Sequence, residues 1–154
     1  LQIVRSAGKE FINLQNTVAI HIRRGDYLQA QERHPVLPMH YYKKALNILC
    51  EKLATTKNEM NIIVFSDDIA WCKENFSGLG ASFSEGRSTL DDMALLSSCE
   101  HQIISASTFS WWAAYLNKNN PVVVSPHKDN WHGSAYAHWD HSDLLPAEFI
   151  QIKY

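Results

Sequence analysis

The sequence lacks any long apolar run and any excess of charge of one sign. No stretch approaches the roughly 18 to 20 apolar residues that a membrane-spanning helix needs, and residues 1–11 (LQIVRSAGKEF) hold no signal-peptide core. Fourteen Lys and Arg residues stand against sixteen Asp and Glu residues, so no broad basic surface exists to attract nucleic acid. We therefore expect no nucleic-acid partner, and membrane association only through parts that are not present.

Cysteine is also scarce. The three cysteines, Cys50, Cys72 and Cys99, are odd in number and lack the spacing of a metal site. Each falls within or at the end of a helix-like segment, which predicts reduced and buried thiols. Unpaired cysteines are typical of reducing compartments, so we expect a cytoplasmic chain.

Strand-like and helix-like segments alternate along the 154 residues, which are enough for one globular domain with a sizeable core. The predicted strands are residues 17–23, 61–65, 101–105 and 121–125, and the predicted helices are residues 38–53, 68–75, 88–99 and 109–116. This alternation predicts an α/β fold, with a Rossmann-like, mainly parallel sheet and helices on both faces, formed as a single domain by residues 1–154. In such sheets, ligands bind outside the carboxyl ends of the strands.

The strongest local signal is the segment HIRRGDY at residues 21–27, which ends the first predicted strand. Two adjacent arginines need anionic partners there, and guanidinium groups suit phosphate oxygens. Because side chains alternate along a strand, we expect His21 and Arg23 to face a ligand and Arg24 to hold a carboxylate. Two alternatives stay open. Both arginines could pair with local acids such as Asp26 and close a loop, or the RGD tripeptide could be one that adhesion receptors recognise.

Polar residues also follow two other predicted strands. Asp67 and Asp68 come directly after the second strand, where acids suit either a ligand or the first turn of a helix. Residues 107–110 (STFS) form a strand-to-helix turn, whose amides and hydroxyls suit a phosphate and equally suit a helix N-cap. Trp111 and Trp112 follow this turn. We expect them to pack in the core, because a helical repeat accounts for Trp112.

Two further patterns concern acidic residues and histidines. Ser88 and Asp91 fit a helix-capping box, which leaves Asp92 without a local partner. Near the C-terminus, His138 and His141 could be neighbours on a helical turn and invite a metal interpretation. We expect no metal site, because the stretch has no recognised ligand spacing and is rich in Gly, Ser and Asn, like a surface loop.

Together these segments resemble the α1,2-fucosyltransferase family, glycosyltransferase family 11. HIRRGDY resembles the H-x-R-R-x-D motif that several fucosyltransferase families share, in the form closest to the α1,2 family. Residues 65–68 (FSDD) resemble the second family motif, and residues 90–93 (LDDM) with residues 107–116 (STFSWWAAYL) resemble the third. The motifs stand in family order, and the resemblance covers about residues 18–152.

The resemblance implies the C-terminal, donor-binding half of a GT-B glycosyltransferase that uses GDP-fucose, with the acceptor-side N-terminal half absent. It implies an inverting transfer of fucose to a glycan acceptor, expected to be a β-galactoside, with no metal or other cofactor. Arg23 with His21 would stabilise the β-phosphate of the leaving GDP, and the family aspartate that matches Asp92 holds the guanine edge. Asp26 and Asp68 are candidates for a general base that the sequence does not identify. The expected donor-binding residues are Arg24, Asp67, Asp68, Asp92, Ser107, Thr108, Phe109 and Ser110.

Two alternative functions stay open. Another fucosyltransferase that uses GDP-fucose, of the protein O- or the α1,6-type, would differ only in its acceptor. A nucleotide-binding or adhesion module without catalysis would bind GDP or cells and turn nothing over. Bacterial members of the family are cytosolic and animal members face the Golgi lumen, and the unpaired cysteines favour the cytoplasm.

Overall fold

A six-stranded sheet forms the centre of the computed structural model, which describes residues 14–154; the segment of residues 1–11 considered above lies outside that range. All neighbouring strands are parallel, in the order β3-β2-β1-β4-β5-β6. The strands are β1 (Thr17–Ile22), β2 (Asn61–Ser66), β3 (Ser82–Phe83), β4 (His101–Ile103), β5 (Val123–Pro126) and β6 (Ile150–Ile152). The predicted Rossmann-like α/β fold is confirmed.

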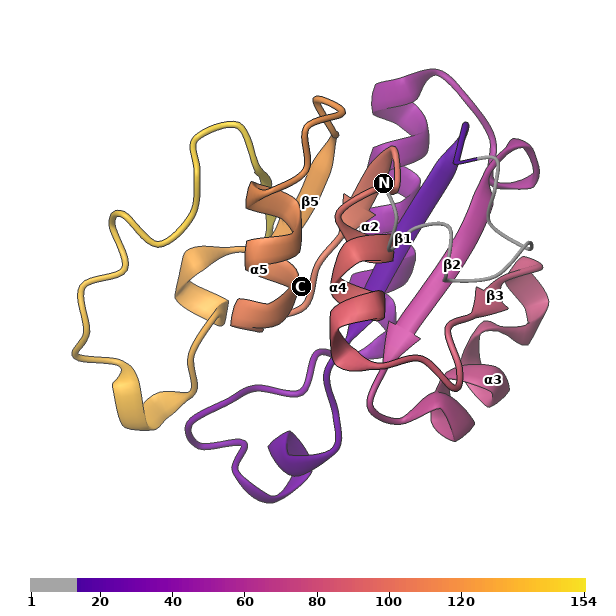
Figure 1. Ribbon diagram of the computed structural model, residues 1–154. Helices are drawn as coiled ribbons and strands as arrows, with labels where there is room; N and C mark the ends of the chain where they lie inside the picture. The colour runs from indigo at the N-terminus through magenta and orange to yellow at the C-terminus, as the bar shows by residue number, and fades with distance from the viewer. Residues whose placement is uncertain (1–13) are drawn as a thin grey trace.

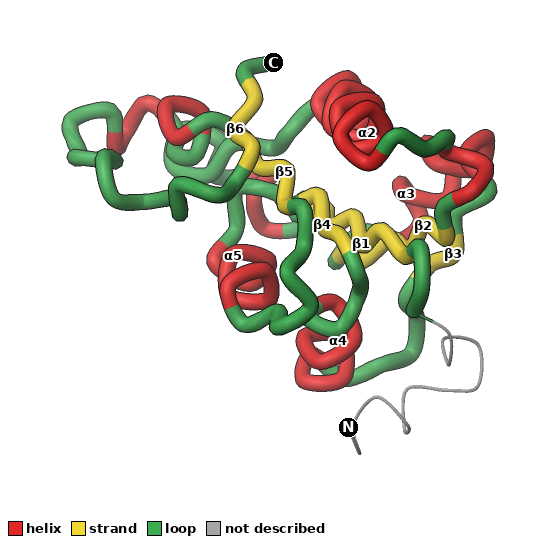
Figure 2. The backbone as a smooth tube through the Cα atoms, turned by 90° about the horizontal axis from the view of Figure 1, so that it is seen from above, coloured by secondary structure: helices red, strands yellow, loops and turns green. Residues whose placement is uncertain are grey.

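Helices cover both faces of this sheet, as Figure 2 shows from above. One face carries α2 (Met39–Leu53) and α3 (Ile69–Phe76), and the other carries α4 (Thr89–Leu96) and α5 (Thr108–Tyr115). Successive side chains of β1 pack alternately against the two layers of helices. Val18, Ile20 and Ile22 belong to the core that includes α2, whereas Ala19 packs with leucines of α4 and an alanine of α5. The place of a residue along β1 therefore decides which face of the sheet its side chain occupies.

Of the four α-helices in residues 14–154, α3 and α4 start with a side-chain cap. The carboxylate of Asp68 accepts the backbone N–H of Trp71 at the start of α3 (3.2 Å), and the hydroxyl of Ser88 accepts the N–H of Asp91 at the start of α4 (3.2 Å). Ser66, at the end of β2, accepts the N–H of Asp68 (2.9 Å). These bonds satisfy amides that have no partner within the helix.

The structure departs from the sequence-based expectation at two strands and one helix. β3 and β6 were not predicted, because two or three residues are too few to show a period. The prediction that Trp112 packs in the core is wrong: it is 50% exposed. The buried side chains of α5 are Ser110, Ala113 and Ala114, so the helix is turned relative to the expected apolar face, and Trp111 is only partly buried.

The strands that follow β1 in the sequence are added to the sheet first on one side of β1 and then on the other. β1, β2 and β3 extend towards one edge, whereas β4, β5 and β6 extend towards the other. The carboxyl ends of β1 and β4 therefore form the switch point at which such sheets open a crevice. In Figure 1 these strand ends point towards the lower part of the view, where the loop after β1 lies.

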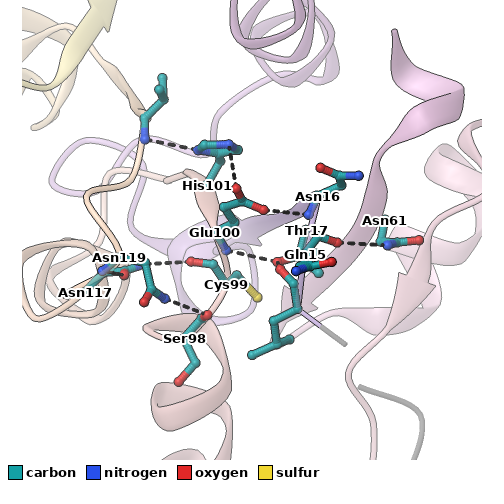
Figure 3. A network of polar contacts seen from close by, with 12 residues as sticks. Gln15, Asn16, Thr17, Asn61, Ser98, Cys99, Glu100, His101, Asn117 and Asn119 are labelled. Atoms are coloured by element: carbon teal, nitrogen blue, oxygen red, sulfur yellow. Dashed lines mark hydrogen bonds and ion pairs between the residues drawn. The ribbon is translucent and has the colours of Figure 1, made fainter. Parts of the chain in front are cut away.

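A polar network occupies the opposite, amino-terminal end of the sheet (Figure 3). The carboxylate of Glu100 accepts the N–H of Asn16 (2.5 Å), and the N–H of Glu100 donates to the hydroxyl of Thr17 (2.9 Å). The side-chain amides of Asn117 and Asn119 donate to backbone carbonyls just after α4 (2.7 and 3.0 Å). The polar groups at this end are engaged in joining loops to strands, which is a structural role.

The cysteine thiols lie inside the fold. The three cysteines are unpaired and buried, as predicted. Burial raises the pKa of the Cys72 thiol to about 11 and that of Cys99 to about 12, so neither forms a reactive thiolate near neutral pH.

Within residues 14–154, no helix is both long enough and apolar enough to cross a membrane.

Candidate active site

A cavity of about 230 Å³ opens at the carboxyl ends of β1 and β2, against the starts of α4 and α5. We call it the switch-point cavity. It is lined by His21, Arg23, Phe65, Ser66, Asp67, Arg87, Thr89, Asp92 and Phe109. The structure thus brings together five of the predicted site residues, namely His21, Arg23, Asp67, Asp92 and Phe109. They come from four segments that are far apart in the sequence.

Arg23 lies between two carboxylates beside this cavity. One guanidinium nitrogen, Nη2, lies 2.8 Å from Asp26 Oδ1, and the other, Nη1, lies 3.2 Å from Asp67 Oδ2. The alternative in which Arg23 pairs with local acids therefore describes part of its environment. The side chain is still 34% exposed, and a guanidinium has five N–H donors. Arg23 retains donors for an anionic ligand, and Asp26, at 67% exposure, can move aside.

Arg24 lies on the other side of the turn, as the strand alternation predicted. Its Nε donates to Asp68 Oδ2 (3.1 Å), and its guanidinium lies 4.0 Å from the ring centroid of Trp71. The prediction that Arg24 holds a carboxylate is confirmed. Arg24 and Asp68 are not among the residues that line the switch-point cavity. With its side chain only 16% exposed, Arg24 is also poorly placed for an adhesion receptor.

Asp67 organises the turn that carries the two arginines. Its Oδ1 accepts the backbone N–H of Arg24 (2.9 Å), while its Oδ2 contacts Arg23. Gly25 makes this arrangement possible, because a Cβ at that position would lie 2.5 Å from Asp67 Oδ2. The glycine of the HIRRGDY segment therefore allows a carboxylate to lie against the turn.

His21 is a buried and neutral histidine at the switch point. Its Nδ1 lies 2.8 Å from the hydroxyl of Ser105, which follows β4, and its ring packs 5.3 Å from that of Phe109. Burial, and then the positive charge of Arg23, lower the pKa of His21 to about 3. The predicted contact of His21 with the β-phosphate stays a prediction. His21 can offer a hydrogen bond but adds no charge.

We expect His21 to make the chain less stable in mild acid. The unfolded histidine takes up a proton near pH 6.5, whereas the folded one stays neutral down to a pKa of about 3. The unfolded state therefore binds more protons in this window, and stability falls as the pH drops from 7 to 5, by about 2 kcal/mol for this group. Urea unfolding of the wild type and of His21→Gln at both pH values measures the effect. Equal pH dependence in the two proteins would show that His21 is not neutral.

Asp92 has a local partner that the sequence did not predict. The hydroxyl of Ser84 donates to Asp92 Oδ1 (2.5 Å) and accepts a hydrogen bond from Arg87 Nη1 (3.2 Å). The expectation that Asp92 lacks a local partner is therefore wrong. Burial raises the pKa of Asp92, and the Ser84 hydrogen bond and the Arg87 charge oppose this rise. Asp92 still lines the switch-point cavity.

Arg87 is a site residue that the sequence reasoning missed. It lies in the loop between β3 and α4 and lines the switch-point cavity. The rule that ligands gather after strands would have pointed to this loop, but β3 is too short to be recognised. With Arg87, the cavity lining holds two guanidinium groups and two carboxylates.

Among residues 107–110, only Phe109 lines the cavity. Ser110 is fully buried, and its hydroxyl lies within 3.3 to 3.4 Å of backbone carbonyls of the preceding turn. Ser107 takes the N-cap position of α5 without a capping bond from its side chain, and Thr108 is exposed. The predicted phosphate contacts of Ser107, Thr108 and Ser110 remain a prediction that depends on the amino end of α5.

The histidines near the C-terminus pair differently from the expectation. His132 Nδ1 lies 2.8 Å from His141 Nε2, whereas His138 contacts the ring of Trp139 edge-on at 6.4 Å. Within the described residues 14–154, no group of three or more His, Cys, Asp or Glu side chains is arranged to hold a metal ion.

Relatives of known sequence share most of this chain. Residues 3–149 match the family Glycosyl transferase family 11. The chain is 42% identical to O-antigen biosynthesis glycosyltransferase WbnK of Escherichia coli over 73% of the chain, and 37% identical to Alpha-1,2-colitosyltransferase of Escherichia coli over 76%. It is 32% identical to Galactoside 2-alpha-L-fucosyltransferase Sec1 of Mus musculus over 70% of the chain. The matches span 39%, 42% and 30% of the length of these relatives. Because the family match covers nearly the whole sequence, the chain belongs to glycosyl transferase family 11.

Proposed function

We propose that the chain binds GDP-fucose and supplies the donor site of an inverting galactoside α1,2-fucosyltransferase. The observation that carries the proposal is that Arg23 and Asp92 line one cavity beside the β1–β4 switch point. A guanidinium suits a diphosphate, and a carboxylate suits a base edge that carries N–H donors. The cavity is smaller than the roughly 300 to 1,000 Å³ of typical ligand sites, so part of a nucleotide sugar would lie outside it.

The arginines supply the charge that the proposed reaction needs. As the bond from fucose to the diphosphate breaks, the leaving GDP gains negative charge on its β-phosphate, and the acceptor hydroxyl attacks the opposite face of the sugar. Arg23 and Arg87 both line the cavity and stabilise this charge. We assign the role to these two side chains without a metal or another cofactor. His21 adds a hydrogen bond only.

Asp92 gives the site its selectivity for guanine. A carboxylate accepts the two neighbouring N–H groups of guanine, whereas adenine presents no such pair. A bound adenine would leave a partly buried carboxylate without donors, which is costly. The half-buried position of Asp92 beside Arg87 and Ser84 fixes the direction of its remaining oxygen.

The general base is better assigned to Asp26 than to Asp68. Both oxygens of Asp68 are engaged, Oδ1 by the N–H of Trp71 and Oδ2 by Arg24. Asp26 is 67% exposed and contacts only the guanidinium of Arg23 among the described ion pairs. An acceptor hydroxyl can reach Asp26 without dismantling a helix cap.

The names of the relatives support two candidate donor sugars. The fucosyltransferase names support fucose and a galactoside acceptor, whereas the 37% identical colitosyltransferase supports colitose as a second candidate. Three buried, unpaired thiols support a reducing compartment such as the cytoplasm.

Thermal unfolding with nucleotides tests the proposed donor site. At a GDP concentration about 100-fold above its dissociation constant, native-state binding adds about 2.7 kcal/mol of stability. We expect GDP to raise the Tm by several degrees, with ADP and UDP much weaker. In a protein that joins this chain to an acceptor-side half, we expect GDP-fucose with lactose to give a fucosylated product. Equal shifts from GDP and ADP would contradict the guanine assignment. Replacing GDP-fucose by GDP-linked colitose in the transfer assay decides between the two sugars.

A further inference from the structure

The connection between β5 and β6 is unusually long for a segment without an α-helix. Residues 127–149 contain only two 3₁₀ turns, Lys128–Asn130 and Ser134–Tyr136. Figure 1 shows this segment, coloured orange to yellow, extending beside the sheet rather than covering it. Ordered connections longer than about 12 to 15 residues are uncommon and usually carry a function. The switch-point cavity uses none of these residues.

A second cavity, of about 510 Å³, opens on this connection. Its size lies within the roughly 300 to 1,000 Å³ of small-molecule sites. The residues that matter for its chemistry are Lys128, His132, Trp139, Asp140 and His141. They mix one large aromatic ring with hydrogen-bonding groups of both charges. The lining also holds Asp129, whose carboxylate is paired with Lys153 (3.0 Å), so the charges largely offset one another. Such a lining fits an uncharged ligand with many hydroxyl groups.

Aromatic side chains build a platform beside this cavity. Tyr136 and Trp139 stack with ring centroids 4.1 Å apart, and His132 meets both rings edge-on at 5.7 and 5.4 Å. Trp139 remains 49% exposed although Tyr136 covers one face. We call these three residues and His141 the aromatic platform. An indole with one packed and one open face is suited to the C–H face of a sugar ring.

The histidine pair complements hydroxyl groups. His132 Nδ1 and His141 Nε2 lie 2.8 Å apart, so one ring donates to the other. Burial, and then His141, lower the pKa of His132. In the neutral pair, either choice of tautomer leaves one donor and one acceptor on the two outer nitrogens. A hydroxyl group needs this combination. Asp140, whose Oδ1 accepts the N–H of Ser142 (2.9 Å), adds a further acceptor.

The loop after β1 holds the platform in place. The N–H of Gly133 donates to the carbonyl of Arg33 (2.9 Å), and the N–H of Ala135 donates to the carbonyl of Glu32 (2.8 Å). A Cβ on Gly133 would meet the Glu32 carbonyl oxygen, so glycine is required for this approach. A platform fixed in advance loses little entropy when a ligand binds.

Ring contacts also connect the platform with the switch-point cavity. Tyr136 lies 6.1 Å from His34, His34 stacks on Tyr27 at 4.7 Å, and the guanidinium of Arg23 lies 5.3 Å from the ring centroid of Tyr27. The two cavities are therefore joined by a continuous row of side chains. This row runs from Tyr136 through His34 and Tyr27 to Arg23.

We propose that the aromatic platform binds one pyranose ring of a neutral glycan, with the C–H face of the ring on Trp139. The hydroxyls of the ring bind the outer nitrogens of His132 and His141 and the carboxylate of Asp140. We further infer that this glycan is the acceptor and that its reacting end extends along Tyr27 towards Arg23. The acceptor role depends on the proposed function, whereas glycan binding does not.

Titration with lactose, followed by NMR of the indole N–H signals, tests the proposal. We expect lactose to shift the Trp139 signal, and Trp139→Ala to weaken lactose binding by roughly tenfold or more. Trp112→Ala is the matched control, because Trp112 is equally exposed and is not part of the platform. It should leave lactose affinity unchanged. Absence of a lactose-dependent shift at Trp139, or equal affinity in Trp139→Ala and the wild type, would overturn the proposal.

Further variants keep the test independent of folding and of the donor site. Trp139→Phe retains a ring and should retain most of the lactose affinity, and Asp140→Asn tests a polar contact on a fully exposed turn. Arg23→Ala should abolish the GDP-dependent rise in Tm while lactose binding persists. Lactose binding without any GDP binding in the wild type would refute the proposed function and the acceptor role, and would leave the glycan site standing.

Discussion

Arg23→Ala should lower the affinity for GDP by about a hundredfold or more, the loss expected when a charge-assisted, bidentate phosphate contact is removed. The effect has two sources. The variant removes the guanidinium, and it leaves Asp26 and Asp67 beside the diphosphate without their ion-pair partner. Isothermal titration of GDP into the wild type and the variant measures the change.

The arginine prediction has a matched control on the same loop. Arg33 is 61% exposed, contacts Glu32 at 3.7 Å and does not line the switch-point cavity. Arg33→Ala should therefore bind GDP as the wild type does. The ion pairs of Arg23 are partly solvent-exposed and add little stability, so Arg23→Ala should remain folded. GDP affinity within threefold of the wild type in Arg23→Ala would remove Arg23 from the site.

Asp92→Asn should weaken GDP binding by about 30- to 100-fold and leave the weak binding of ADP unchanged. The substituted amide keeps one acceptor, but its NH₂ group faces an N–H of guanine instead of accepting from it. Its neutral side chain also loses the attraction to the donors of the base. Competition titrations with GDP and ADP give both affinities for the same protein sample.

The neighbouring aspartate provides the control for this change. Asp91 belongs to the cap of α4, where the hydroxyl of Ser88 donates to its carboxylate (2.8 Å), and it does not line the cavity. Asp91→Asn should lower stability by a few tenths of a kcal/mol to about 1 kcal/mol through the helix start. It should not change GDP affinity. An equal loss of GDP binding in both variants would mean that the α4 start, rather than Asp92, forms the contact.

The sequence predicted the parts of the fold in which a pattern repeats. Side chains alternate in direction along any strand, so those of β1 could be placed on the two faces of the sheet. The same alternation correctly separated Arg23, which lines the cavity, from Arg24, which pairs with Asp68. The capping chemistry at Ser88 also predicted the start of α4. In each case the signal lies within a few neighbouring residues.

The missed features depend on contacts between distant segments. β3 has two residues and no period, and without it Arg87 could not be placed after a strand. The partner of Asp92, Ser84, lies in the same loop. The helical repeat of α5 predicted a buried Trp112, but Ser110, Ala113 and Ala114 make the buried face, because small residues allow the helix to approach the sheet and α4 closely.

The aromatic platform was equally hidden from the sequence. Its residues lie in a connection without helical or strand periodicity, and the expected histidine pair was His138 with His141. The observed pair, His132 with His141, depends on how the connection folds back on the loop after β1 at Gly133. In the sequence, a single glycine, Gly133, is the only sign that these two loops approach each other.

A crystal structure of the chain with bound GDP tests the donor site most directly. We expect the guanidinium of Arg23 within hydrogen-bond distance of the β-phosphate, and the carboxylate of Asp92 against the N–H edge of guanine. The nucleotide would then extend across the carboxyl ends of β1 and β2. GDP bound elsewhere, or guanine turned away from Asp92 with the phosphates out of reach of Arg23, would contradict the proposed site.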